Sequence, residues 1–169
     1  MSQKPLVLPD IRSRAGAFVA QWRDAEGYER GEAQSFVRDL LRVFGITRST
    51  AAVYEKRAQR ASTGGQGYID ALISGTALIE MKSAGADLVK AEAQALDYIE
   101  SLTEHESPDF VITSDFRSFR LLDLTAEAGE DGLLEFTLEE LPAHVEDLMF
   151  LAGYRRAKWL FGHSVGIRS

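Results

Sequence analysis

The chain has no cysteine among its 169 residues, which excludes disulfide bonds and zinc sites built on thiolates. Every apolar run is far shorter than the roughly 20 residues that a membrane-spanning helix needs. The first ten residues, MSQKPLVLPD, lack the apolar core of a secretory signal. Internal repeats and low-complexity tracts are also missing. These absences predict one soluble domain over residues 1–169, located in the cytoplasm and not at a membrane.

Positive charge is scarce in the middle of the chain. Residues 1–60 hold eleven Lys and Arg against seven Asp and Glu, whereas residues 61–154 hold four against nineteen. The net charge of −7 argues weakly against nucleic-acid binding, but an enzyme that holds a cation beside a polyanion needs both signs close together. The basic side chains that could contact phosphates, or could equally be ordinary solvated charges, are Arg38, Arg42, Arg48, Lys56, Arg57 and Arg60.

Hydrophobic periodicity predicts an α/β fold, because helical and strand-like segments alternate along the chain. The first helix is expected to follow Asp10 as its N-cap and to bury Trp22. The segment SDFRS is expected to be a turn between two strands, although Asp115 and Arg117 within it could form a second acidic-x-basic pair. Helices are expected at 11–26, 29–44, 86–102 and in most of 138–160, and strands within 51–58, 108–124 (two) and 132–138 and at 68–73 and 77–83.

The segment IDALISGTALIEMK, residues 69–82, predicts a hairpin that carries charge. If its loop is the three residues SGT, Asp70 faces Glu80 with Cβ atoms about 5 Å apart. Strand alternation then places Lys82 on the same face as Glu80, whereas a shift of one residue in register would separate the carboxylates. The same register pairs Ala71 with Ile79, Leu72 with Leu78 and Ile73 with Ala77.

Two facing carboxylates repel each other unless a cation lies between them, and oxygen ligands of this kind suit Mg²⁺ or Mn²⁺. Such an ion polarises a phosphodiester and lowers the pKa of a bound water, and the ammonium of Lys82 can orient that water. The simpler interpretation is a solvated edge hairpin whose charges discourage aggregation. The strand ALIEMK lies between another strand and a helix, so we expect it inside the sheet, where charge needs a reason.

An aspartate, a turn and then Glu-x-Lys resembles the PD-(D/E)xK nuclease superfamily. The resemblance implies a restriction-endonuclease-like mixed central sheet flanked by helices, with Asp70, Glu80 and Lys82 as catalytic residues. It also implies that Asp70, Glu80 and the backbone carbonyl of Met81 hold the metal ion. Glu32 resembles the acidic residue of the first core helix in many members and is a further candidate ligand, or else a solvated glutamate in a first helical turn.

Gln94 and Tyr98 lie four residues apart and share a face of the helix expected at 86–102. The pair looks like the Gln-x-x-x-Tyr element of the RecB-like nuclease branch, which lies beside the active site. The alternative is a polar residue and an amphipathic tyrosine at a helix boundary. Together with Arg57 and Arg60, Gln94 and Tyr98 are the candidate supporting and DNA-binding residues.

A closer resemblance covers most of the chain and rests on the stretches GYID, LIEMKSAG and SDFRSFRL. In combination they are similar to the N-terminal nuclease domain of MmeI-type (type IIL) restriction–modification enzymes. The resemblance implies a Mg²⁺-dependent endonuclease that acts on double-stranded DNA, with Mn²⁺ as a substitute. It also implies methyltransferase and target-recognition domains in the same parent polypeptide.

The sequence departs from the whole MmeI-type enzyme in what it lacks. No glycine-rich methyl-donor loop and no Asn-Pro-Pro-Tyr tetrad occur in it, so neither methylation nor sequence-specific recognition is assigned to it. One active site per chain predicts that two copies pair transiently to cut both strands. Two alternatives stay open: a non-catalytic DNA-binding or assembly module on a nuclease scaffold, and a free-standing RecB-like repair nuclease that acts on DNA ends.

Overall fold

The computed structural model describes residues 6–27, 29–48 and 51–153. Its six strands form one sheet in sequence order, and every neighbouring pair is antiparallel except β3 and β4. This mixed sheet with flanking helices confirms the predicted α/β class. The elements are α1 (Leu8–Trp22), α2 (Glu29–Val43), β1 (Val53–Gln59), β2 (Gln66–Ile73), β3 (Ala77–Met81), α3 (Leu88–Ile99), β4 (Phe110–Ser114), β5 (Ser118–Asp123), β6 (Leu133–Thr137) and the 3₁₀ helix η1 (Leu138–Ala152).

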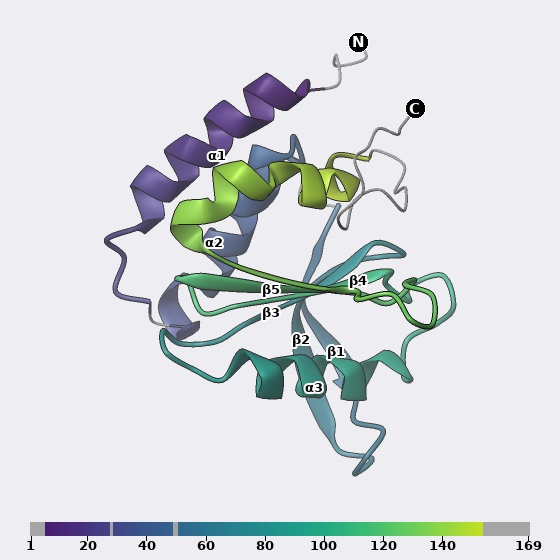
Figure 1. Cartoon of the computed structure of the whole chain (residues 1–169). Coiled ribbons are helices and arrows are strands. Elements are labelled where there is room, and N and C mark those ends of the chain that lie inside the picture. The colour runs from purple at the N-terminus through teal and green to yellow at the C-terminus, as the bar shows by residue number, and fades with distance from the viewer. Residues whose placement is uncertain (1–5, 28, 49–50, 154–169) are drawn as a thin grey trace.

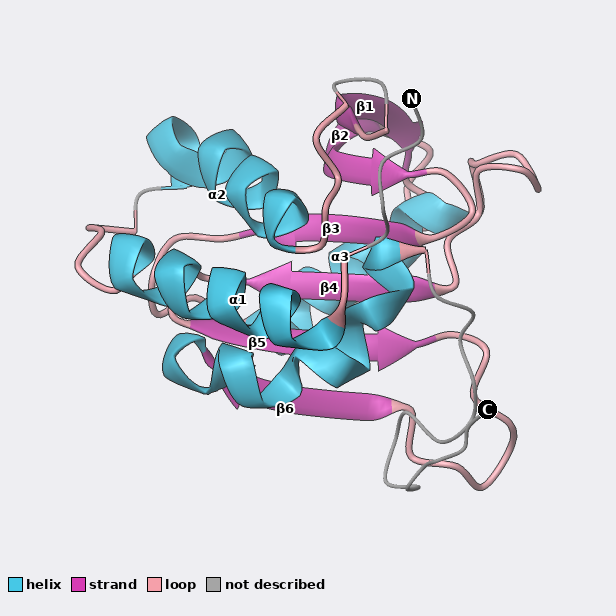
Figure 2. Ribbon diagram, turned by 90° about the horizontal axis from the view of Figure 1, so that it is seen from above, coloured by secondary structure: helices cyan, strands magenta, loops and turns pink. Residues whose placement is uncertain are grey.

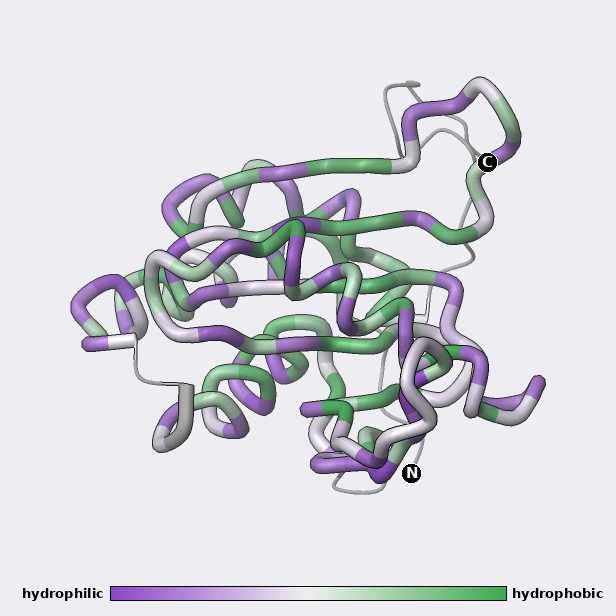
Figure 3. The backbone as a smooth tube through the Cα atoms, turned by 90° about the horizontal axis from the view of Figure 1, so that it is seen from below, coloured by the Kyte–Doolittle hydropathy of each residue, from purple (hydrophilic) through white to green (hydrophobic). Residues whose placement is uncertain are grey.

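The sheet separates two layers of helices, with α1, α2 and η1 on one face and α3 on the other (Figure 1). Viewed from above, α1, α2 and η1 cover the part of the sheet from β3 to β6 (Figure 2). The central strands β3 and β4 are buried over their whole length, whereas the loop between β5 and β6 includes several strongly hydrophilic residues (Figure 3). The prediction that ALIEMK forms an interior strand is therefore confirmed.

Aromatic side chains join α1 and α2 to the sheet. The ring of Phe36 in α2 packs edge-on against Phe18 of α1 and against Phe116 in the β4–β5 turn, with centroids 5.0 Å apart in both pairs. Trp22 is buried in the same cluster as predicted, and its indole N–H donates to Asp39 Oδ2 over 3.1 Å. The indole therefore satisfies its polar atom while its rings pack in the core.

Several predicted helix boundaries differ from the structure by a few residues, and two of the differences have a clear reason or limit. Helix α1 begins at Leu8, three residues earlier than expected, because Pro9 fits the first turn, where its missing N–H costs nothing. The N-cap position belongs to Val7, so the prediction that Asp10 caps this helix is wrong; Asp10 lies in the first turn. At the other end, the expected helix continues past the described residues, and only η1, of 3₁₀ type, is described. Within the described ranges, no helix combines the length and apolar character needed to cross a bilayer.

One of the contacts that hold the β1–β2 hairpin on α3 joins a glycine and a tyrosine. A Cβ added at Gly67 of β2 would overlap the hydroxyl oxygen of Tyr98 and lie 2.8 Å from its Cζ. Tyr98 is 5% exposed, and the guanidinium of Arg60 lies 5.2 Å from its ring centroid on the outer side. Glycine at position 67 therefore lets β2 approach the tyrosine ring directly.

Replacing Gly67 with alanine is expected to destabilise the fold by about 1–3 kcal/mol, because the added methyl group overpacks against Tyr98. The same substitution in a Tyr98→Ala background is expected to cost much less, since the ring that it strikes is gone. Urea denaturation of the four proteins of this cycle measures both free energies of unfolding. Equal costs in the two backgrounds would contradict the contact.

The ion pair between Lys56 of β1 and Glu106 is expected to make the fold sensitive to acid. The Lys56 ammonium lies 2.8 Å from Glu106 Oε2 and, chiefly through this hydrogen bond, lowers the pKa of that carboxyl from 4.5 to about 2. Because the folded pKa is depressed, the stabilisation is complete above pH 4.5 and is lost as the pH falls through about 2. Unfolding free energies measured from pH 6 to 2 are expected to converge for the wild type and Lys56→Gln; a constant difference would contradict this.

Candidate active site

The predicted register of the charged hairpin is confirmed. Cα partners are Ala71 with Ile79, Leu72 with Leu78 and Ile73 with Ala77, and Gly75 takes a φ of +72° in the SGT loop. The regular pairing of β2 with β3 ends at Ala71 and Ile79. Asp70 and Glu80 are the next residues along the two strands, so they lie where β2 and β3 separate. A three-residue turn with glycine in the left-handed region fixes this register.

Asp70 and Glu80 are held together by two hydrogen bonds that cross between the strands. Asp70 Oδ2 accepts the backbone N–H of Met81 over 2.7 Å, and Glu80 Oε1 accepts the backbone N–H of Asp70 over 3.1 Å. Glu80 is only 4% exposed, and burying such a carboxylate without hydrogen bonds would be costly. Each acid therefore fixes the backbone next to the other acid, and both carboxylates are set in one place.

Lys82 directly follows β3, and two separate parts of the chain hold its backbone and the residues after it. The N–H of Lys82 donates to Ser114 O over 2.8 Å, and the N–H of Ala84 donates to Gly27 O over 3.1 Å. The N–H of Gly85 donates to Asp115 Oδ2 over 2.8 Å. Residues 82–85 are therefore fixed to the end of β4 and to the α1–α2 connection, although they form no regular element.

Asp115 organises the β4–β5 turn. Its Oδ1 accepts the N–H groups of Arg117 (3.1 Å) and Ser118 (2.8 Å), and its side chain is largely buried, with 7% of the residue exposed. The prediction of a turn at SDFRS is confirmed. Because the same carboxylate also accepts from Gly85, it links this turn to the segment that follows Lys82, a connection that the sequence pattern did not reveal.

A cleft of about 750 Å³ opens beside Asp70, between α2 and the β1–β2 hairpin. Burial raises the pKa of Tyr54 in its wall, against the opposing charges of Arg38 and Arg42. Glu55 has a φ of +51°, a left-handed conformation within a strand, at the position of β1 that the register places opposite Asp70. The glycine and the polar residues that line the cleft are Gly31, Gln34, Ser35 and Arg38 of α2, Tyr54 and Glu55 of β1, Asp70 and Ser83.

None of the remaining predicted site residues is among the residues that line this cleft. Glu32 is half-buried on α2 between two cleft-lining residues but does not itself line the cleft. Gln94 and Tyr98 are on α3, across the sheet from α2 (Figure 1). Tyr98 packs in an apolar cluster, as the alternative interpretation of this pair allows, and Gln94 is half-buried. Arg57 is exposed on β1, and Arg60 lies on the ring of Tyr98.

The donor set near Asp70 consists of hard oxygen atoms from few residues. Among the residues that the structure describes, no group of three or more His, Cys, Asp or Glu side chains is placed to hold a metal ion. Two carboxylates and the neighbouring Met81 carbonyl still fit Mg²⁺, which commonly binds one or two carboxylates and completes its shell with water and substrate phosphates. The geometry therefore suits an ion that is shared with a phosphorylated ligand.

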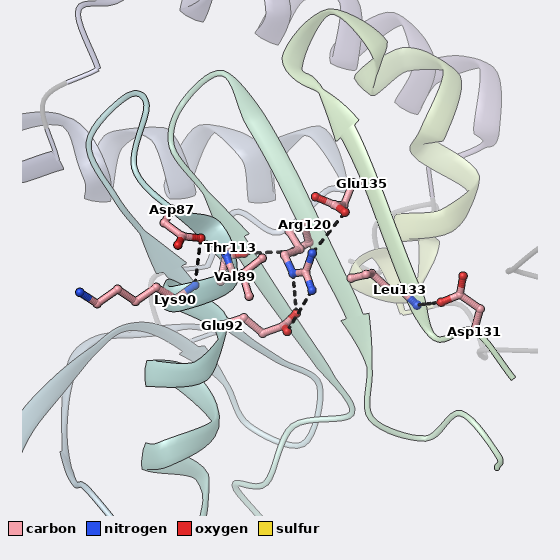
Figure 4. A network of polar contacts seen from close by, with 9 residues as sticks. All are labelled: Asp87, Val89, Lys90, Glu92, Thr113, Arg120, Asp131, Leu133 and Glu135. Carbon is pink, nitrogen blue, oxygen red and sulfur yellow. Dashed lines mark hydrogen bonds and ion pairs between the residues drawn. The ribbon is translucent and has the colours of Figure 1, made fainter. Parts of the chain in front are cut away.

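A row of polar residues crosses the sheet from Glu80. The register places Glu80 beside Thr113, Thr113 beside Arg120 and Arg120 beside Glu135. Arg120 also reaches Glu92 of α3, with Nε 3.0 Å from Oε1, and this hydrogen bond is the main cause that raises the pKa of the guanidinium. Figure 4 shows the guanidinium between Glu92 and Glu135. The half-buried cation is thus balanced by two carboxylates and ties α3 to β5.

Comparison with known proteins identifies a family and a similar solved structure. The family described as "MmeI, N-terminal domain" matches residues 13–163, which confirms the resemblance given by the sequence motifs. None of the curated proteins matches the chain. A cryoEM structure of a DrdV–DNA complex is similar in fold, with a TM-score of 0.50 and 14% sequence identity. The match covers 89% of this chain but only 14% of that chain.

Replacing Asp115 with asparagine is expected to destabilise the fold by about 1–3 kcal/mol, because the amide NH₂ would face the Gly85 N–H without an acceptor. The DNA cleavage that the sequence motifs predict is expected to fall further, by about tenfold or more, since residues 82–85 lose their anchor behind Lys82. Asp131→Asn is the matched control, because within the described residues Asp131 accepts a hydrogen bond only from the N–H of Leu133, next to the β5–β6 loop. Chemical denaturation and single-turnover cleavage measure the two effects; equal behaviour of both variants would contradict the anchor.

Proposed function

The chain belongs to the MmeI N-terminal domain family, and from this premise we propose that it is the metal-dependent DNA endonuclease domain of a restriction–modification protein. The observation that carries the proposal is the pair of crossed hydrogen bonds between Asp70, Glu80 and Met81. These bonds hold the buried Glu80 carboxylate next to Asp70, which lines an open cleft, and a pair of carboxylates that can bind a metal ion supports hydrolysis of a phosphodiester.

Each residue of the group has a distinct role in this proposal. Asp70, Glu80 and the Met81 carbonyl hold Mg²⁺, or Mn²⁺ as a substitute, with Glu32 as an outer candidate. When bound, the ion polarises the phosphate and lowers the pKa of the attacking water. Lys82 orients that water or offsets the negative charge that develops on the phosphate. The backbone hydrogen bonds of Lys82 and of the residues after it fix the point from which its side chain extends.

Double-stranded DNA is the substrate in this proposal, and Gln94, Tyr98, Arg57 and Arg60 support its binding. The burial of Tyr98 and its contact with Arg60 suggest that these two act by shaping the β1–β2 hairpin. Methylation and target recognition belong to other parts of the parent polypeptide. Two copies pair transiently to cut both strands, because each chain supplies one active site.

The full-length protein is expected to nick plasmid DNA with Mg²⁺ and to stop when EDTA is added. Lys82→Ala and Glu80→Gln are each expected to lower the cleavage rate by about 10²–10³-fold, because each removes a charge that acts on the reacting phosphate. Lys90→Ala is the matched control, since Lys90 is an exposed lysine of α3. Initial nicking rates on an agarose gel give the comparison.

Three outcomes separate the alternatives to this function. Absence of Mg²⁺-dependent nicking, with DNA binding intact, would identify a non-catalytic DNA-binding or assembly module. Cleavage of linear DNA with no action on supercoiled circles would identify a nuclease that acts on ends. Equal loss in Lys90→Ala and Lys82→Ala would show that Lys82 has no specific role in cleavage.

A further inference from the structure

The wall of the cleft formed by α2 contains a glycine that the packing of the protein does not require. Gly31 lies in the first turn of α2 and lines the cleft. A Cβ built at this position would meet no atom within 4 Å, and its φ is not in the left-handed region. Glycine is among the least favourable residues in a helix, so alanine would be the better choice for the fold alone. The space beside Gly31 faces the cleft.

Arg38 lies on the same side of α2 as Gly31, because residues 31, 35 and 38 recur at helical spacing. Its guanidinium carbon is 5.9 Å from the centroid of the Tyr54 ring, and its side chain is exposed. Within the described part of the chain, no carboxylate forms an ion pair with Arg38. A cation that is oriented by an aromatic ring but lacks an anionic partner is suited to bind a phosphate.

The two walls of the cleft differ in their hydrogen-bonding character. The α2 wall carries the side chains of Gln34, Ser35 and Arg38, which can all donate, whereas the acidic lining residues Glu55 and Asp70 belong to strands β1 and β2. An elongated anion would lie along the donor wall with one of its phosphates directed at Asp70. The sugar–phosphate backbone of one DNA strand has this repeating negative charge.

We propose that Gly31, Ser35 and Arg38 of α2, with Tyr54 orienting Arg38, form the surface that holds the backbone of the strand to be cut. This inference rests on the proposed function, because it takes Asp70 as part of the cleavage site. Gly31 lets the backbone of the strand approach the helix where a methyl group would stand in its path. Arg38 binds a phosphate next to the one that is hydrolysed.

The test of Gly31 compares two glycines that differ only in what they face. Gly31→Ala is expected to keep or raise the melting temperature of the full-length protein but to weaken duplex binding and single-turnover cleavage by about tenfold. Gly16→Ala is the control, since a Cβ at Gly16 of α1 also meets nothing within 4 Å and lies outside the cleft. It is expected to keep or raise the melting temperature and to leave binding and cleavage unchanged.

The test of Arg38 uses the salt dependence of binding. Fluorescence polarisation of a labelled duplex in EDTA, at several NaCl concentrations, gives the slope of log affinity against log salt. Arg38→Gln is expected to reduce this slope by about one, as the loss of one phosphate contact requires. The charge-matched control is Arg12→Gln, because Arg12 lies on α1 and pairs with Glu146 of η1; its slope is expected to stay unchanged.

The outcomes distinguish this inference from the proposed function. If the wild type cleaves DNA and both Gly31→Ala and Arg38→Gln bind and cleave normally, the surface on α2 is wrong and the nuclease stands. If the wild type never cleaves but both variants bind duplex more weakly than their controls, the surface stands and the nuclease is wrong. If the wild type neither cleaves nor binds duplex DNA, both are overturned.

Discussion

The candidate site depends on how an interior strand of the sheet accommodates a buried carboxylate. Glu80 lies within β3, where every neighbouring residue is buried, and its oxygen is satisfied by the backbone N–H of Asp70, while Asp70 accepts from Met81. Both of these donors are main-chain groups, which carry no formal charge. These two bonds therefore leave the negative charge of the carboxylates uncancelled, which suits the binding of a metal ion.

Hydrogen bonds of the main chain also position the segment after β3. Lys82 receives its position from hydrogen bonds of the backbone to Ser114, and the following residues from Gly27 and Asp115. Gly27 lies far in the sequence from Ser114 and Asp115. The segment can therefore adopt its shape only when α1, α2 and the β4–β5 turn are all in place. The aromatic contacts of Phe36 with Phe18 and Phe116 bring those parts together, and the core thereby determines the geometry of the site.

The sequence predicts those features of the site that loop length and strand alternation determine. Loop length and strand alternation fix the register of the hairpin, so the meeting of Asp70 and Glu80 followed from the letters SGT and the pattern around them. The left-handed conformation of Glu55 and the void beside Gly31 depend on neighbours in space, and no periodic pattern encodes them. Tyr98 shows the same limit, because its helical spacing from Gln94 fits an outward-facing pair as well as the observed contact with Gly67.

The distribution of charge explains how an acidic chain can present a site for a polyanion. Helix α2 and strand β1 belong to residues 1–60, where basic residues are in excess, and both line the cleft. Much of the acidic excess of the later residues is committed elsewhere, as with Glu92 and Glu135 around Arg120. Charges act over about 8–10 Å at physiological ionic strength, so a phosphate in the cleft responds to Arg38 more than to the net charge. The total of −7 opposes distant approach but does not decide contact. Under the proposed function, the chain is therefore expected to act on DNA that other parts of the parent polypeptide have already bound.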